Sequence, residues 1–266
     1  MDKELLEITG RFPGQVGLVA EDLVSGERFS LEAAEVFPAA STMKLFVLGA
    51  ILEAGADLTE QLPLLASELA SGSGVLKDLT VGSLYSLRDL LTLMITVSDN
   101  TATNLLLERF GFPFFQDYLG RHGFSQTRIE RKLSHPGSAD WTGANLTSPA
   151  DLAGFLRGLW SGQLLGEPAR SLALDILRRQ HYLNLIQALP VDGDQIEDGE
   201  DPLVVYSKSG SLRRARHDCG ILVRGNRSTL LAVMSRADLD LSFNSVNPGA
   251  QLLWEVGAWA YRRWLS

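Results

Sequence analysis

Residues 203–234 read LVVYSKSGSLRRARHDCGILVRGNRSTLLAVM, and the predicted fold class depends on this segment more than on any other. Within it, residues 203–207, 219–223 and 229–234 are short apolar runs rich in β-branched side chains. Such runs, separated by charged and glycine-containing segments, are typical of consecutive β-strands. The C-terminal part of the chain is therefore expected to contain a set of strands.

Two further strands are predicted near the other end of the chain. Residues 15–23 and 27–31 have strand patterns, and Ser25 and Gly26 between them are typical of a hairpin turn. Most of the chain between the two ends has the apolar periodicity of helices. The predicted helices are 2–12, 41–53, 86–97, 101–110, 149–160, 168–187 and 247–264.

Strands at both ends with helices between them imply that the two ends pair into one sheet. The helical block is then an insertion that packs on one side of that sheet. We predict an α+β fold, with a sheet domain made of residues 1–40 and 203–266 and a helical domain made of residues 41–202.

The composition is that of an ordinary globular protein. The chain has 266 residues, of which 45% are hydrophobic and 21% are charged, so it can bury a sizeable core. Its formal net charge of −8 argues against nucleic acid and anionic membranes as partners, because both require a basic patch. The single cysteine, Cys219, excludes an intramolecular disulfide.

The first residues do not resemble a secretion signal. Residues 1–7 lack the basic start and the apolar core that such a signal needs. The best apolar run, 45–52, is too short to span a bilayer and ends near Glu53 and Gly55. As written, the sequence predicts a cytoplasmic protein, or a periplasmic or secreted one if a leader has been removed.

Ser41-Thr42-Met43-Lys44 is the first of three motifs that indicate chemistry. Residues three apart lie on one face of a helix, so the Lys44 ammonium can reach the Ser41 hydroxyl. A serine needs a neighbouring base to act as a nucleophile, and a buried lysine with a lowered pKa can be that base. Taken alone, the pattern more often marks a lysine that extends from a helix surface into water.

The other two motifs are Ser98-Asp99-Asn100, after the apolar run 90–97, and Lys208-Ser209-Gly210-Ser211, after the strand 203–207. Taken alone, the second motif is a common helix start, with Asp99 or Asn100 as the N-cap. In the third motif, a lysine and two hydroxyls at a strand edge suit a carboxylate ligand, and Gly210 lets a substrate approach the backbone. Its ordinary interpretation is a strand that runs into a polar turn.

The three motifs together are more specific than any one of them, because each occurs once and in a fixed order. Ser-x-x-Lys, Ser-Asp-Asn and Lys-Thr-Gly are typical of class A β-lactamases and penicillin-binding proteins, and Ser209 here keeps the hydroxyl of the threonine. The matching stretches are 37–44 (FPAASTMK), 95–106 (ITVSDNTATNLL) and 147–152 (TSPADL). From about residue 15 to 260, the chain resembles the class A β-lactamase family. This resemblance implies a five-stranded antiparallel sheet flanked by N- and C-terminal helices, with an inserted all-helical domain.

The resemblance implies a role for each motif residue. Ser41 would be the acylated nucleophile, and Lys44 would be the general base in acylation. Ser98 would relay a proton to the departing ring nitrogen. The backbone N–H groups of Ser41 and Ser211 would form the oxyanion hole.

Other residues would bind the substrate. Asn100 would hold the amide of the substrate side chain. The substrate carboxylate would contact Lys208, Ser209 and Ser211. Arg216 is either a further carboxylate contact or a solvated cation in a turn, because the segment around it departs from the family pattern.

The main departure from the family lies in the omega loop, where class A β-lactamases carry a glutamate that activates water for deacylation. Residues 130–134 (ERKLS) resemble the family motif Glu-x-x-Leu-Asn, which makes Glu130 a candidate for that base. In a second alignment, residues 127–131 match the run before the motif, and the glutamate position falls on Leu133. We favour the second alignment because it needs fewer gaps to reach Thr147.

We therefore predict a serine hydrolase that opens β-lactam rings through a Ser41 acyl-enzyme. A D-Ala-D-Ala peptidase or esterase, a slow-turnover penicillin-binding protein and a non-catalytic sensing module are the alternatives, because acylation does not require the omega-loop glutamate. His135 in the same loop is another candidate base, although loop histidines are ordinarily surface residues. The histidines have no metal-ligand spacing, so we expect no metal or cofactor. The expected partner is a small β-lactam or D-Ala-D-Ala-like substrate, bound by a monomer.

Overall fold

A computed structural model describes residues 2–133, 145–186, 201–238 and 247–266. Its centre is a five-stranded sheet in the order β2-β1-β9-β8-β7, with every neighbouring pair antiparallel. The strands are β1 (Gln15–Asp22), β2 (Arg28–Leu31), β7 (Val204–Leu212), β8 (Ala215–Arg224) and β9 (Arg227–Arg236). β1 pairs with β9, so the two ends of the chain form one sheet, and the predicted α+β class is confirmed.

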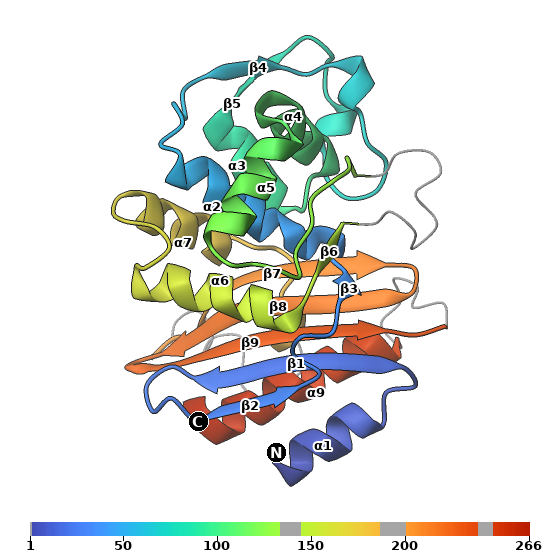
Figure 1. Cartoon of the computed structure of the whole chain (residues 1–266), viewed down its shortest axis with the longest axis vertical. Helices are drawn as coiled ribbons and strands as arrows, with labels where there is room; N and C mark the ends of the chain where they lie inside the picture. Colours follow the sequence, from blue (N-terminus) through green and yellow to red (C-terminus); the bar gives the residue numbers. More distant parts are fainter. Residues whose placement is uncertain (1, 134–144, 187–200, 239–246) are drawn as a thin grey trace.

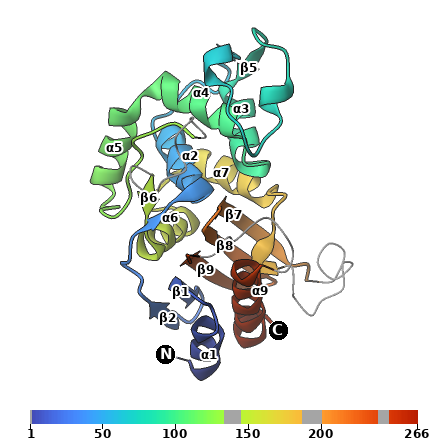
Figure 2. The same cartoon turned by 90° about the vertical axis from the view of Figure 1, so that its right-hand side faces the viewer.

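Helices cover both faces of the sheet (Figures 1 and 2). On one face, Leu18 and Val233 pack with α1 (Lys3–Gly10) and α9 (Pro248–Ala260). On the other face, Val19 and Ala232 belong to the larger core that includes α2 (Lys44–Glu53) and α6 (Pro149–Ser161). The central strands are buried on both faces, and β1 and β9 are accordingly apolar in their middle parts, whereas β8 also buries the polar residues Arg216, His217 and Asp218.

The helices between β2 and β7 pack around α2, in which residues 44–52 are all buried. A helix that is apolar on every side belongs in the interior of a domain. The other α-helices of this part are α3 (Leu87–Thr96), α4 (Asn100–Phe110), α5 (Phe112–Arg121) and α7 (Ala169–Arg178). Its 3-10 turns are η1 (Ala40–Met43), η2 (Ala66–Glu68), η3 (Leu76–Asp78) and η4 (Asn184–Ile186), and its short strands are β3 (Phe37–Pro38), β4 (Gln61–Pro63), β5 (Leu84–Ser86) and β6 (Leu146–Thr147).

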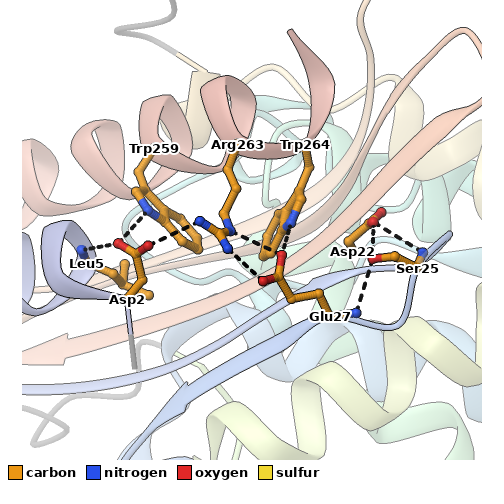
Figure 3. Close-up of polar contacts among 8 residues, drawn as sticks. All are labelled: Asp2, Leu5, Asp22, Ser25, Glu27, Trp259, Arg263 and Trp264. Atoms are coloured by element: carbon orange, nitrogen blue, oxygen red, sulfur yellow. Dashed lines mark hydrogen bonds and ion pairs between the residues drawn. The ribbon is translucent and has the colours of Figure 1, made fainter.

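The two termini are joined by hydrogen bonds (Figure 3). The Asp2 carboxylate accepts from Trp259 Nε1 at 3.1 Å and from Arg263 Nη1 at 3.2 Å. Glu27, directly before β2, accepts from Trp264 Nε1 at 2.8 Å and from Arg263. The last residues form a single π-turn, η5 (Tyr261–Leu265), after α9. These contacts hold the C-terminal segment against α1 and the β1–β2 hairpin.

Several element boundaries differ from the predictions. The sequence predicts one helix over 168–187, but α7 ends at Arg178. It predicts that the strand ends at residue 207, but β7 continues to Leu212 because its polar residues remain paired with β8. The predicted hairpin at Ser25 and Gly26 is confirmed, and Gly26 adopts the φ of 78° that a turn of this kind favours.

Candidate active site

Ser41 lies in the 3-10 turn η1, which leads from β3 into α2. In a 3-10 turn, residues three apart lie above one another, and the Lys44 N–H is bonded to the Ser41 carbonyl. Ser41 is partly exposed, whereas Lys44 is fully buried. Ala40, directly before the serine, has a φ of 47°, a conformation that is uncommon for residues other than glycine. Ser41 is therefore held at the surface, with the lysine below it.

The Lys44 ammonium joins the first motif to the second. Its Nζ donates to the Ser98 carbonyl at 2.8 Å, and it lies 3.1 Å from Ser98 Oγ and 2.9 Å from Asn100 Oδ1. Burial lowers the Lys44 pKa well below its ordinary value, and the charge of Lys208 lowers it further, while Asp99 opposes the shift. A lowered pKa favours the neutral amine, and the neutral amine is the form that can act as a base.

Asp99 holds the loop in which Ser98 and Asn100 lie. Its Oδ1 accepts from Ala102 N at 2.9 Å, so Asp99 is the N-cap of α4. Its Oδ2 accepts from Val75 N at 2.7 Å and from Leu76 N at 2.8 Å. The second motif is thus a helix start, as its local pattern predicts, and it also places Ser98 and Asn100 against Lys44.

Gly210 allows β7 to run directly against the turn that carries Ser41. A Cβ at this position would lie 3.0 Å from Thr42 Cγ2, 3.1 Å from Ala40 Cβ and 3.2 Å from Ser41 N. These distances are tighter than ordinary van der Waals contacts, so glycine is the residue that permits this approach. The third motif therefore lies beside the first, on the edge strand of the sheet.

Lys208 is buried within β7, two residues before Gly210. Its Nζ donates to the Ser209 carbonyl at 2.9 Å. Burial lowers the pKa of Lys208 to about 8, while the nearby Asp218 carboxylate opposes the shift. Near neutral pH the side chain is mainly an ammonium, a point charge suited to an anionic ligand. Ser209 is buried and Ser211 is partly exposed on the same strand.

Arg216 is not a solvated turn residue, so that alternative is wrong. It lies within β8, opposite Ser211, and is 5% exposed. Its Nη1 donates to the Leu212 carbonyl at 2.7 Å and to the Ala215 carbonyl at 3.0 Å, and its aliphatic part packs against Gly249 of α9. The guanidinium therefore ties the two sides of the β7–β8 turn together.

The two candidate omega-loop positions have different environments. The Glu130 side chain is 58% exposed, and Arg128 Nη1 lies 3.9 Å from its Oε1. Leu133 is partly buried against the main core, and its N–H donates to Asn104 Oδ1 at 2.8 Å. Asn104 Nδ2 donates back to the Leu133 carbonyl at 3.1 Å, so α4 clamps this residue by its backbone. His135 lies outside the described residues.

His217 is a structural residue of the site that the sequence does not reveal. It lies opposite Gly210 in the sheet, and its Nδ1 accepts from Ser235 N at 3.2 Å. The tautomer that follows places a proton on Nε2, which lies 2.8 Å from the Pro38 carbonyl. Burial lowers the His217 pKa to about 4, so the ring is neutral near pH 7. This neutral ring anchors the β3 segment that leads to Ser41.

The described residues contain no group of three or more His, Cys, Asp or Glu side chains that could hold a metal ion. Within the same part of the chain, no helix has the length and apolar composition of a membrane span.

Solved structures that are similar to this chain include β-lactamases and a penicillin-binding protein. A β-lactamase from Sphaerobacter thermophilus is 27% identical, with a TM-score of 0.85 over 98% of this chain and 95% of that one. A variant of the penicillin-binding protein PBP-A, solved as an acyl-enzyme complex with penicillin G, is also 27% identical, with a TM-score of 0.81 over 98% of this chain and 96% of that one.

The chain belongs to the β-lactamase enzyme family, whose model matches residues 1–264. A β-lactamase of Amycolatopsis lactamdurans is 31% identical over 245 residues, which cover 88% of this chain and 77% of that relative. The predicted resemblance to class A β-lactamases is therefore confirmed. Membership of this family supports β-lactam hydrolysis as the class of activity.

Proposed function

We propose that the protein opens β-lactam rings by transferring the acyl group to Ser41 Oγ. The observation that carries this proposal is the buried Lys44 amine, one turn below Ser41 and in contact with Ser98 and Asn100. In its neutral form Lys44 accepts the Ser41 hydroxyl proton as Oγ attacks the β-lactam carbonyl carbon. The ring C–N bond breaks, the nitrogen takes a proton from Ser98 Oγ, and Lys44 returns a proton to Ser98.

The remaining motif residues act in binding in this proposal. The Lys208 ammonium, with the hydroxyls of Ser209 and Ser211, binds the substrate carboxylate. Asn100 binds the amide of the substrate side chain. The N–H groups of Ser41 and Ser211 stabilise the oxyanion, an effect of about 3 kcal/mol per donor in other enzymes. The close approach of β7 to the Ser41 turn at Gly210 supports this oxyanion hole.

We further propose that hydrolysis of the acyl-enzyme is slow. Glu130 is exposed beside Arg128, which does not suit a base that must act on a sequestered water. The Asn104 clamp on Leu133 supports the alignment in which Leu133 takes the glutamate position. The acyl-enzyme that the PBP-A variant forms with penicillin G supports a long-lived adduct on this fold.

A D-Ala-D-Ala peptidase or esterase is the second candidate function. The same acylation machinery serves it, and the observation that favours it is the absence of a carboxylate at Leu133. Steady cleavage of an acyl-D-Ala-D-Ala peptide, with no β-lactam turnover, would distinguish it from a β-lactamase.

Intact-mass measurement after mixing the protein with penicillin G tests the proposal. The wild type is expected to gain the mass of one penicillin, and Ser41→Ala is expected to gain none. Ser25→Ala, in the exposed β1–β2 turn, is the matched control and should be acylated like the wild type. An adduct on Ser41→Ala would disprove the nucleophile assignment.

We also propose that the acting species is a monomer, divided into a sheet domain (1–40 and 203–266) and a helical domain (41–202). Sedimentation analysis with and without penicillin G tests whether the protein is a monomer, because a dimer would have twice the mass.

A further inference from the structure

One face of α4 contacts three segments that surround the candidate site. Asn100, Asn104 and Glu108 are four residues apart and therefore lie along one side of the helix. Asn104 clamps Leu133, as described above. Glu108 Oε2 lies 2.8 Å from Nζ of Lys132, the residue before Leu133. This face of α4 thus holds the described end of the omega loop from two sides.

Lys132 also contacts Glu68, which lies in η2. Its Nζ donates to Glu68 Oε1 at 2.9 Å and lies 2.8 Å from Glu68 Oε2. Glu68, in η2, is 4% exposed, whereas Glu108 is largely exposed. Burial alone would lower the Lys132 pKa, but the hydrogen bonds to Glu108 and Glu68 outweigh burial and raise it. A charged lysine therefore bridges a buried carboxylate and an exposed one.

The segment that begins at Glu68 wraps the first turn of α4. Ala70 N donates to Thr101 Oγ1 at 3.0 Å. The Ser71 carbonyl accepts from Asn100 Nδ2 at 3.0 Å, and the Ser73 carbonyl accepts from Asn100 N at 3.1 Å. The segment therefore orients the Asn100 side chain, whose Oδ1 lies against Lys44.

We propose that Lys132 and Glu68 are positioning residues that set the amide-binding side of the active site through Asn100. Without Lys132, the buried Glu68 carboxylate would keep the Ser67 hydroxyl but lose its cation, which is destabilising unless the segment moves toward water or the carboxylate takes up a proton. Movement of residues 68–73 displaces the carbonyl that orients Asn100 Nδ2. The inference rests on the proposed function, because it assumes that Asn100 binds the substrate amide.

The test compares two β-lactams that differ in that amide. Penicillin G carries a side-chain amide, and 6-aminopenicillanic acid has a free amine in its place. The second-order rate of adduct formation is measured by time-resolved intact mass for each compound. Lys132→Met should lower the penicillin G rate about tenfold more than the 6-aminopenicillanic acid rate, the size expected for one lost oriented hydrogen bond.

Three further variants separate positioning from general damage. Lys132→Arg keeps the charge and should restore the wild-type ratio of the two rates. The double variant Lys132→Met with Glu68→Gln removes the uncompensated charge, so it should recover part of the ratio and fold even if the single variant does not. Arg109 lies on α4, away from Asn100, and pairs with Glu60. Arg109→Met breaks this ion pair and should leave the ratio of the two rates unchanged.

An equal loss with both compounds would overturn the proposal, because a merely structural role has no reason to distinguish them. An unchanged ratio in Lys132→Met would overturn it as well. If the wild type forms no adduct with either compound, the proposed function fails and the inference fails with it. If the wild type is acylated and only the ratio test fails, the proposed function stands without this inference.

Discussion

The residues proposed to form the acyl-enzyme and the omega-loop carboxylate considered for its release lie in opposite environments. Lys44 and Lys208 are both fully buried, and their ammonium groups contact neighbouring backbone or motif oxygens. Glu130, the carboxylate that the local omega-loop motif offers, is 58% exposed. Buried polar groups in fixed contacts keep the geometry that a reaction needs, whereas an exposed carboxylate has no fixed target. This difference indicates that the site favours formation of the acyl-enzyme over its hydrolysis.

Among the changes considered, replacement of Lys44 should have the largest effect, because it removes the base that acylation requires. Lys44→Met keeps an unbranched side chain in the buried position but removes the proposed base. The acylation rate with penicillin G is expected to fall by about 10²–10⁴-fold, the usual contribution of a general base. Stopped-flow measurement of adduct formation checks it, with Lys3→Met on the exposed face of α1 as the control. An acylation rate within a few-fold of the wild type would remove Lys44 from the mechanism.

Supplying a base in the omega loop should have the next largest effect. Leu133→Glu places a carboxylate at the residue that Asn104 clamps, and it should shorten the adduct lifetime by about 10²-fold. Leu133→Gln has the same shape without the base, so it should leave the lifetime long. Decay of the penicillin G adduct is followed by intact mass. Equal lifetimes in the two variants would argue that Leu133 does not occupy the family's glutamate position.

The pH dependence of acylation should separate the two lysines. As pH rises through about 8, Lys208 loses its charge, so the rate with penicillin G should fall by about tenfold per pH unit. As pH falls, protonation of Lys44 removes the base and should lower the rate at the acid end. The methyl ester of penicillin G has no carboxylate and should lack the alkaline decrease. An alkaline decrease of the same size with the ester would place that titration elsewhere.

Glu130→Gln should have the smallest effect. Because Glu130 is exposed beside Arg128, the variant is expected to change the adduct lifetime by less than about twofold, as for most surface substitutions. The lifetime of the penicillin G adduct is again the measurement. A markedly longer lifetime would identify Glu130 as the deacylation base and would reverse the comparison between the two regions.

Much of the architecture could be predicted because its signals are local. Alternating and continuous apolar runs predict strands, and the order of strands and helices predicts the α+β class. Boundaries within polar segments were less predictable, since the residues of β7 near Gly210 have no apolar pattern and are held in the strand by pairing with β8. The helix predicted over 168–187 likewise continues past the point where α7 ends.

The sequence by itself determined which residues are candidates for the chemistry, since Ser41, Ser98 and Lys208 belong to motifs of fixed type and order. Only the tertiary structure decided how they are placed: the burial of Lys44, the burial of Arg216 and the opposite environments of Glu130 and Leu133. The physical reason is that burial and pKa depend on neighbours from distant segments. Lys44 meets Ser98 across 54 positions of sequence, and no local pattern records such a contact.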